Sequence, residues 1–181
     1  MLFYTRRLGL KNSRRPETYG MKTAAIATKL TVEDISRIVE PLRKMGKTLV
    51  TTNGCFDLLH TGHVNYLQDA ASLGDILVVG VNSDQSVGRL KGPSRPIRKE
   101  QDRVLLISSL KPVDYAFIFK EPDPCAFLSV LRPDIHVKGG DYSPEELPET
   151  KVVELHGGKV VIVPFAEGYS TTRLIAAIQT K

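Results

Sequence analysis

The chain has 181 residues, 41% of them hydrophobic, and a formal net charge of +5. This length and apolar content suit one soluble globular domain. Residues 1–30 carry seven basic residues and one acidic residue, so the rest of the chain has a net charge of −1. The body of the protein therefore lacks the basic composition of a nucleic-acid-binding surface, and we expect no nucleic-acid partner.

The first 30 residues differ from the rest of the chain. They contain no apolar stretch long enough for a signal peptide or a membrane span, so we expect neither export nor membrane attachment. We expect residues 1–30 to be a disordered basic extension and residues 31–181 to be the folded domain. A transit peptide is the alternative interpretation of the extension, and Met21 is an alternative natural start.

The two cysteines give no sign of a disulfide framework or a structural metal. Cys55 and Cys125 lie far apart in the sequence, and neither belongs to a C-x-x-C pair. A reducing, cytoplasmic location follows, and no protein metal site is expected.

The first predicted helix follows Thr31, which can serve as its N-cap. Glu33 and Asp34 then lie in the first turn, where acidic side chains interact favourably with the helix dipole. Gly46 is suited to end the helix, and Pro41 is expected to kink or divide it.

Downstream, apolar runs alternate with amphipathic segments. The runs predict strands at 48–52, 75–82, 115–119, 135–138 and 159–164. The amphipathic segments predict helices at 63–73, 100–110, 124–131, 149–156 and 171–179. Strands that are apolar on both faces and alternate with helices indicate a parallel sheet covered on both sides. We therefore expect a single α/β domain with a doubly wound, Rossmann-like, five-stranded sheet.

Ligands of such folds bind at the carboxyl ends of the strands. The segments that follow the predicted strands carry the unusual residues of this chain: 53–63, 82–98, 138–142 and 167–172. The candidate site is therefore sought in these four segments.

Two histidines stand three residues apart in the segment TTNGCFDLLHTGHVNYL. If His63 opens a helix, the unpaired N–H groups of its first turn face the loop and favour an anion, and His60 reaches the same space. Gly54 and Gly62 leave room for the close approach of a phosphate. Alternatively, the imidazoles only cap the helix. A zinc site is a weaker interpretation of the two histidines, because too few further histidines or cysteines lie nearby in the sequence to complete the set of ligands.

The stretch GCFDLLHTGH resembles the G-x-F-D-x-x-H-x-G-H signature of the cytidylyltransferase-like nucleotidyltransferases. The resemblance implies attack of a substrate phosphate oxygen on the α-phosphorus of a nucleoside triphosphate, with pyrophosphate leaving. It also implies catalytic roles for His60 and His63 and contacts to ATP from Asn53, Gly54, Cys55, Phe56, Asp57 and Gly62.

The stretch RLKGPSRPIR places four basic residues and two prolines between a strand and a helix. A basic loop on a slightly acidic body is a candidate phosphate clamp, although a solvated surface loop would have a similar composition. The family resemblance implies that Lys91 is catalytic, on a mobile loop. Arg89, Arg95 and Arg98 are candidates for binding the phosphate of the second substrate.

Two further segments are candidates for ATP binding. HVKGGDY offers Lys138, Gly139, Gly140 and Asp141 at a strand end, where a plain turn would use the same residues. EGYSTTRLI offers Ser170, Thr171 and Thr172 at a helix start, where hydroxyl groups can bind phosphate or cap the helix.

Together, TNGCFDLLHTGH, RLKGPSRP, VKGGDY and GYSTT resemble the adenylyltransferases of ADP-heptose synthesis, a step toward the lipopolysaccharide inner core. The resemblance implies ATP and a heptose 1-phosphate as substrates, ADP-heptose and pyrophosphate as products, and Mg²⁺ as the ion that accompanies ATP. It further implies a heptose kinase, expected on a separate chain. The oligomeric state stays open, a homodimer included.

Other functions are the alternatives to this interpretation. Glycerol-phosphate cytidylyltransferases carry an arginine where this chain has Phe165, which disfavours CTP. A flavin-nucleotide synthetase, a nucleotide-sensing protein without turnover, and a nucleic-acid binder acting through the basic tail are further candidates.

Overall fold

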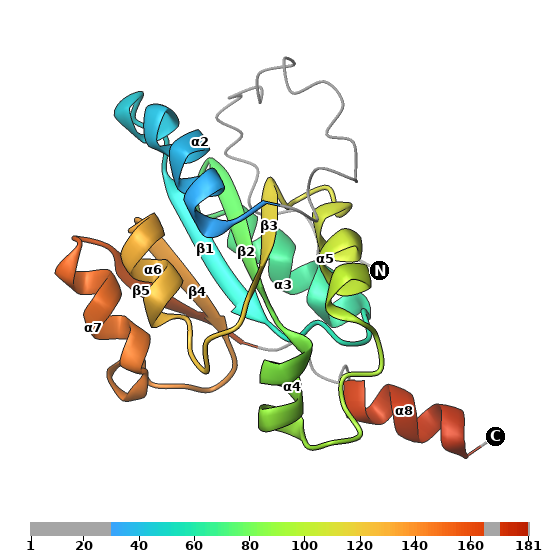
Figure 1. The fold of residues 1–181 in the computed structure, drawn as a ribbon. Coiled ribbons are helices and arrows are strands. Elements are labelled where there is room, and N and C mark those ends of the chain that lie inside the picture. The colour runs from blue at the N-terminus through green and yellow to red at the C-terminus, as the bar shows by residue number, and fades with distance from the viewer. Residues whose placement is uncertain (1–29, 165–170, 181) are drawn as a thin grey trace, which may run out of the picture.

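The computed structural model describes residues 30–164 and 171–180. The predicted N-terminal extension lies almost wholly outside these residues. Five parallel strands form one sheet in the order β3-β2-β1-β4-β5 (Figure 1). The strands are β1 (Leu49–Gly54), β2 (Ile76–Asn82), β3 (Tyr115–Phe119), β4 (Ile135–Gly139) and β5 (Lys159–Val163). The predicted doubly wound, Rossmann-like sheet is confirmed.

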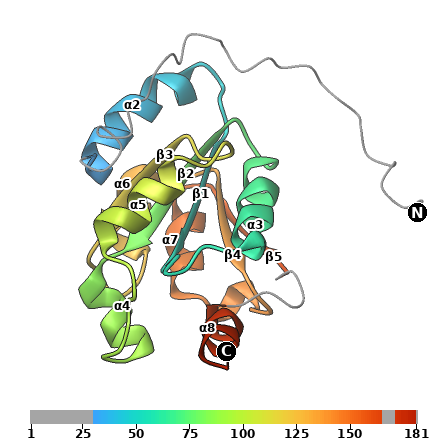
Figure 2. The ribbon, with the colours of Figure 1, turned by 90° about the vertical axis from the view of Figure 1, so that its right-hand side faces the viewer.

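Helices cover both faces of the sheet, as the apolar strands require. On one face lie α2 (Val32–Lys44), α6 (Cys125–Leu131) and α7 (Pro148–Leu155). On the other lie α3 (Thr61–Ala71) and α5 (Glu100–Ser108). Figure 2 shows α2 and α3 on opposite sides of the strands. Along β2, Val78 packs toward the α2 face, whereas Leu77 and Val79 pack toward the α3 face.

The predicted boundaries agree with the structure to within two residues for most elements. Thr31 caps α2 in a reciprocal capping box with Asp34, as expected of an acidic first turn. The expectation for Pro41 is wrong in part, because α2 continues through it as one helix. Gly46 follows the helix with a φ of 80°, a conformation that glycine adopts without strain.

Two elements were not predicted. The helix α4 (Asp84–Lys91) follows β2 directly, and Ser83 caps it by accepting the N–H of Ser86 at 3.2 Å. A short 3₁₀ helix, η1 (Pro144–Glu146), precedes α7. The Ser83–Asp84 pair is the sequence signal for α4, since serine is favoured at an N-cap and aspartate in the first turn.

Aspartates that directly precede three strands hold the amino edge of the sheet together. Their carboxylates accept backbone N–H groups at the starts of neighbouring strands: Asp75 from Thr48 (2.9 Å), Asp114 from Leu77 (2.9 Å) and Asp134 from Leu49 (2.7 Å). These bonds fix the register at that edge. Over the described part of the chain, no helix combines the length and apolar character needed to cross a membrane.

Candidate active site

A cavity of about 600 Å³ lies at the carboxyl edge of the sheet. The strand order reverses between β1 and β4, where folds of this kind bind their ligands. Figure 1 shows α4 and α8 (Thr171–Gln179) at this edge. Thirteen of the residues predicted for the site line the cavity: Asn53, Gly54, Cys55, Phe56, Asp57, His60, Gly62, His63, Lys91, Arg95, Lys138, Gly139 and Thr171.

The two histidines lie side by side at the start of α3. Their rings stack with centroids 3.9 Å apart and planes inclined by 22°. The helix begins at Thr61, two residues before the predicted start, so His60 is the N-cap and His63 lies in the first turn. The side chain of His60 makes no capping hydrogen bond, which argues against the capping interpretation. Gly62 and His63 of this first turn line the cavity, and the N–H groups at the start of a helix favour an anion.

The imidazole of His63 packs against an aromatic ring. Phe56 meets it edge to face with centroids 5.3 Å apart, and the backbone of Phe56 is left-handed with a φ of 45°. Such a conformation is strained for a phenylalanine and is found mainly where function requires it. Burial, followed by the charges of His60 and Lys91, lowers the pKa of His63 to about 4. Burial also lowers the pKa of His60, so both imidazoles are neutral near pH 7.

The predicted position of Lys91 on a loop is wrong. It is the last residue of α4 rather than part of the loop, which runs from Gly92 to Lys99. Its charge lowers the pKa of both His63 and Cys55, although burial raises the pKa of the Cys55 thiol overall. Lys91 therefore lies close enough to His63 for its charge to act on the imidazole, and both residues line the same cavity.

Asp57 ties the basic loop to the histidine motif. Its carboxylate is 2% exposed and accepts Nε of Arg95 at 2.5 Å, together with the N–H groups of Ile97 (2.8 Å) and Arg98 (3.0 Å). Asp57 was predicted to contact ATP; it lines the cavity, and in this structure its oxygens accept hydrogen bonds from the protein. Its role in this geometry is to position Arg95, which lines the cavity.

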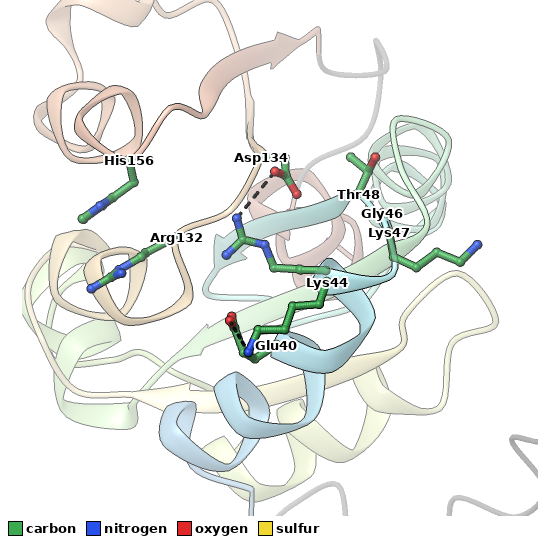
Figure 3. Close-up of a pocket in the computed structure, with 9 residues that line it drawn as sticks. Glu40, Lys44, Gly46, Lys47, Thr48, Arg132, Asp134 and His156 are labelled. Carbon is green, nitrogen blue, oxygen red and sulfur yellow. Dashed lines mark ion pairs between the residues drawn. The ribbon is translucent and has the colours of Figure 1, made fainter.

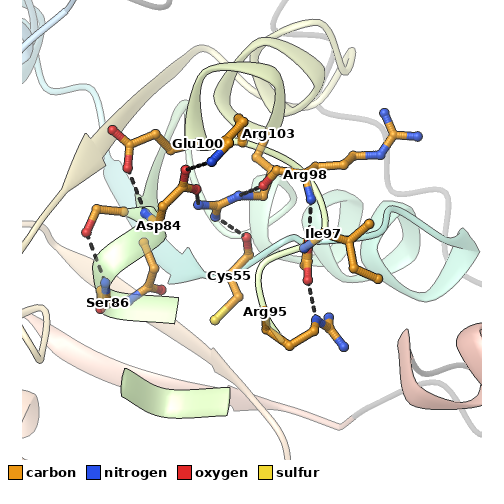
Figure 4. Close-up of polar contacts among 12 residues, drawn as sticks. Cys55, Asp84, Ser86, Arg95, Ile97, Arg98, Glu100 and Arg103 are labelled. Atoms are coloured by element: carbon orange, nitrogen blue, oxygen red, sulfur yellow. Dashed lines mark hydrogen bonds and ion pairs between the residues drawn. The ribbon is translucent and has the colours of Figure 1, made fainter. Parts of the chain in front are cut away.

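Arg103 is a residue that the sequence analysis did not identify. It is fully buried in α5 and donates to the carbonyl groups of Cys55 (2.6 Å) and Arg98 (3.0 Å) and to the carboxylate of Asp84 (2.9 Å) (Figure 4). It thereby joins the motif loop, the basic loop and the start of α4. An arginine four residues before Ile107, on the apolar face of a predicted helix, was the available signal.

Lys138 lines the cavity, and its side chain makes two polar contacts there. Its ammonium group lies 2.7 Å from the buried carboxylate of Glu149 in α7 and donates to Oδ1 of Asn53 at 3.3 Å. Glu149 was not predicted, because it lies on an adjoining helix with no motif around it. The pair links β1, β4 and α7 at the floor of the cavity.

Several predicted residues lie elsewhere. Arg89 donates to the carbonyl of Lys120 at 3.0 Å, and the exposed Arg98 points away from Arg95 and Cys55 (Figure 4). Gly140 and Asp141 are not among the residues that line the cavity. Two further predictions fall on parts that the structure leaves undescribed: Ser170, and the side chain of Thr172.

Carboxylates, thiols and imidazoles do not gather into a metal site in the described ranges 30–164 and 171–180. The residues around the histidines are donors of hydrogen bonds, and Asp57 is already engaged. This donor set fits a metal ion that arrives on a triphosphate, coordinated by phosphate oxygens and water, since Mg²⁺ commonly binds in this way.

A second hollow, of about 560 Å³, lies at the amino edge of the sheet (Figure 3). It is lined by the end of α2 and by Lys47, Arg132, Asp134 and His156. Three of its cations are paired with acids: Arg43 with Asp134 (3.6 Å), Lys44 with Glu40 (3.6 Å) and Lys47 with Asp75 (2.9 Å).

Most of the chain is similar to proteins of known sequence. The chain is 51% identical over 146 residues to the bifunctional protein HldE of Syntrophotalea carbinolica and 50% identical over 149 residues to that of Gluconobacter oxydans. These matches cover 81% and 82% of this chain but only 30% and 31% of the relatives, so the chain spans about a third of their length.

A solved structure shows the same fold. The lipopolysaccharide core biosynthesis protein from Thermoplasma volcanium matches with a TM-score of 0.56 and 35% identity, over 69% of this chain and 100% of that protein. The model of the cytidylyltransferase-like family matches residues 51–177, which include the histidine motif, Lys91, Lys138 and Thr171. This chain therefore belongs to the cytidylyltransferase-like family.

Proposed function

We propose that this protein is an adenylyltransferase that transfers AMP from ATP to a heptose 1-phosphate, giving ADP-heptose and pyrophosphate. The observation that carries the proposal is the grouping of His60, His63, Lys91 and Arg95 on one side of the cavity at the strand ends. A heptose as acceptor is supported by the four motifs and by the relatives, one of which is named for lipopolysaccharide core biosynthesis.

In the proposed reaction an oxygen of the sugar phosphate attacks the α-phosphorus of ATP. One P–O bond forms, the bond to the pyrophosphate breaks, and negative charge builds up on the leaving oxygens. The stacked imidazoles and the first-turn N–H groups of α3 can donate hydrogen bonds to these oxygens. Lys91 and Arg95 add positive charge beside them, and Asp57 holds Arg95 in place.

Both histidines begin the reaction neutral, because burial lowers their pKa. A neutral imidazole still donates one hydrogen bond, and the negative charge of a bound triphosphate favours its protonation. The site therefore gains positive charge when the phosphates arrive. Mg²⁺ would be held by the phosphate oxygens, where it neutralises part of their charge.

The acceptor requires a kinase that phosphorylates the heptose beforehand, and we propose that this kinase acts earlier in the same pathway. The relatives are named bifunctional, and the matched part is about a third of their length. Co-purification of a heptose kinase with this protein would test whether the two activities lie on separate chains.

The direct test supplies ATP or CTP with a panel of sugar 1-phosphates and with glycerol 3-phosphate, and identifies the products by mass spectrometry. We expect ADP-heptose from ATP and heptose 1-phosphate, with ATP exceeding CTP in kcat/KM by about 10²-fold, because a site built for one base leaves polar groups unpaired with another. Faster turnover of CTP with glycerol 3-phosphate would overturn the proposed substrates and leave the family assignment intact.

A further inference from the structure

The cavity has a second flank, opposite in chemistry to the histidines. It is formed at the ends of β2 and β3, where Asn82 and the segment Pro122–Pro124 line the cavity. Neither Asn82 nor this segment contributes a basic side chain. A phosphate is therefore not favoured on this flank, whereas a neutral polar group is.

Asn82 offers an amide oxygen as an acceptor at the cavity. The residue is 4% exposed, and its Nδ2 donates to Oγ of Ser86 at 3.0 Å. Among the residues that the structure describes, none donates to its Oδ1. An amide oxygen that lines a cavity and accepts no hydrogen bond from these residues is available to a donor group of a ligand.

Asp123 adds a carboxylate to the same flank. Its Oδ1 accepts the N–H of Cys125 at 2.9 Å, which orients the side chain at the start of α6. Burial, followed by Asp123 and Glu149, raises the pKa of the Cys125 thiol to about 11, in keeping with carboxylates that converge on this region. Lys138 offsets the charge of Glu149, so Asp123 is the carboxylate that faces the cavity without a cationic partner in the described part of the chain.

The flank thus offers hydrogen-bond acceptors, an amide oxygen and a carboxylate. Hydroxyl groups complement such acceptors, whereas phosphate oxygens do not. The cavity is divided accordingly, with cations beside the histidines and acceptors at the ends of β2 and β3.

We propose that Asn82 and Asp123 determine acceptor specificity by binding hydroxyl groups of its sugar. This inference rests on the proposed function and names the part of the site that reads the sugar. The nucleoside of ATP is expected at the other end of the cavity, near Gly139 and Thr171 on the side of β4 and β5. The strand order leaves the side of β2 and β3 for the second substrate.

The test measures steady-state kinetics for Asp123→Ala and Asn82→Ser with ATP and heptose 1-phosphate. We expect the KM for heptose 1-phosphate to rise about tenfold in each variant, as for loss of one hydrogen bond to a charged or buried group, with the KM for ATP within about twofold. The matched control is Glu121→Gln, which changes an exposed acid in the same loop that does not line the cavity.

Deoxy analogues of the acceptor, each of which lacks one hydroxyl group, identify the hydroxyl group that Asn82 or Asp123 binds. A deoxy acceptor that costs the wild type about tenfold in kcat/KM should cost Asp123→Ala or Asn82→Ser almost nothing, because the partner is already gone. Equal penalties in wild type and variants, or a KM for ATP that rises as much as that for the acceptor, would overturn the inference.

Failure of the proposed function is recognised separately. If wild-type protein releases no pyrophosphate from ATP with any sugar 1-phosphate, the adenylyltransferase proposal is wrong. Calorimetric titration with heptose 1-phosphate then tests the subsite directly. Weaker binding to Asp123→Ala than to Glu121→Gln supports it, and equal or undetectable binding in both variants and the wild type overturns it.

Discussion

Two hollows of similar volume lie at opposite edges of the same sheet, about 600 Å³ at the carboxyl edge and about 560 Å³ at the amino edge. At the amino edge, aspartates accept backbone N–H groups of the strands, and Arg43, Lys44 and Lys47 pair with acids. At the carboxyl edge, imidazoles, Lys91 and Asn82 face the cavity. Hollows of similar volume therefore differ in the chemical groups that they offer to a ligand.

The contrast has a cause in the parallel sheet. All strands begin at one edge, where their first N–H groups need acceptors, and the aspartates before β2, β3 and β4 supply them. At the other edge the loops and the first turn of α3 leave N–H donors facing outward. A ligand with negative charge therefore finds unpaired N–H donors at the carboxyl edge.

The largest expected effect is a loss of kcat that distinguishes two histidines, His63 at the carboxyl-edge cavity and His156 at the amino-edge hollow. His63→Ala should lower kcat by about 10²- to 10³-fold, because it removes a donor to the leaving phosphates. His156→Ala, in the amino-edge hollow, should leave kcat within about twofold. Pyrophosphate release under saturating ATP measures both, and similar losses in the two variants would erase the distinction between the hollows.

Two lysines extend the comparison. Lys91→Ala should lower kcat/KM by about 10²-fold without loss of thermal stability, because the residue is exposed at the end of α4. Its matched control is Lys47→Ala, which removes the ion pair with Asp75 and should affect only stability, slightly. A melting temperature that falls with activity in Lys91→Ala would make that lysine structural.

A third prediction concerns His136, which lies between the edges on β4. Burial, and then the charge of Lys138, lowers its pKa to about 3. The unfolded chain, with a histidine pKa near 6.5, therefore binds the proton first as pH falls. The stability contributed by neutral His136 is full above about pH 6.5 and is lost as pH decreases toward 3.

Denaturant titrations between pH 7 and pH 4 check this prediction. The free energy of unfolding of the wild type should fall more steeply than that of His136→Gln, by up to about 1.4 kcal/mol per pH unit, the limit for one proton. Parallel curves would contradict the assignment of acid sensitivity to this residue.

The smallest expected effect lies in the amino-edge hollow. Arg132 ends α6 with a φ of 47°, a left-handed conformation that costs a non-glycine residue about 1 kcal/mol. Arg132→Gly should therefore raise the free energy of unfolding by about 0.5 kcal/mol, after the entropy of glycine is counted, and leave activity unchanged. Gly46→Ala, at a φ of 80°, is the reverse control and should destabilise. A loss of activity in Arg132→Gly would show that this hollow has a function after all.

Sequence patterns alone were sufficient to predict the five strands, the edge at which the cavity lies and the histidine motif. Hydrophobic periodicity is a local property, and G-x-F-D-x-x-H-x-G-H spans ten consecutive residues, so both can be read without tertiary contacts. The helix α4 was not predicted because most of its residues are polar, so it lacks a clear apolar stripe. Lys91 was consequently assigned to a loop.

Tertiary structure decided what those residues touch. Lys138 meets Asn53 across 85 positions in the sequence, and Arg103 meets Cys55 across 48. No periodicity links such pairs, because chain crossovers and packing determine which side chains meet. The same holds for Asp57, whose motif position indicated a ligand contact but whose oxygens bind Arg95 and the basic loop. The sequence by itself determined that the cavity lies at the carboxyl edge and contains the two histidines. Folding determined which charged side chains meet there and how the cavity is divided into two flanks.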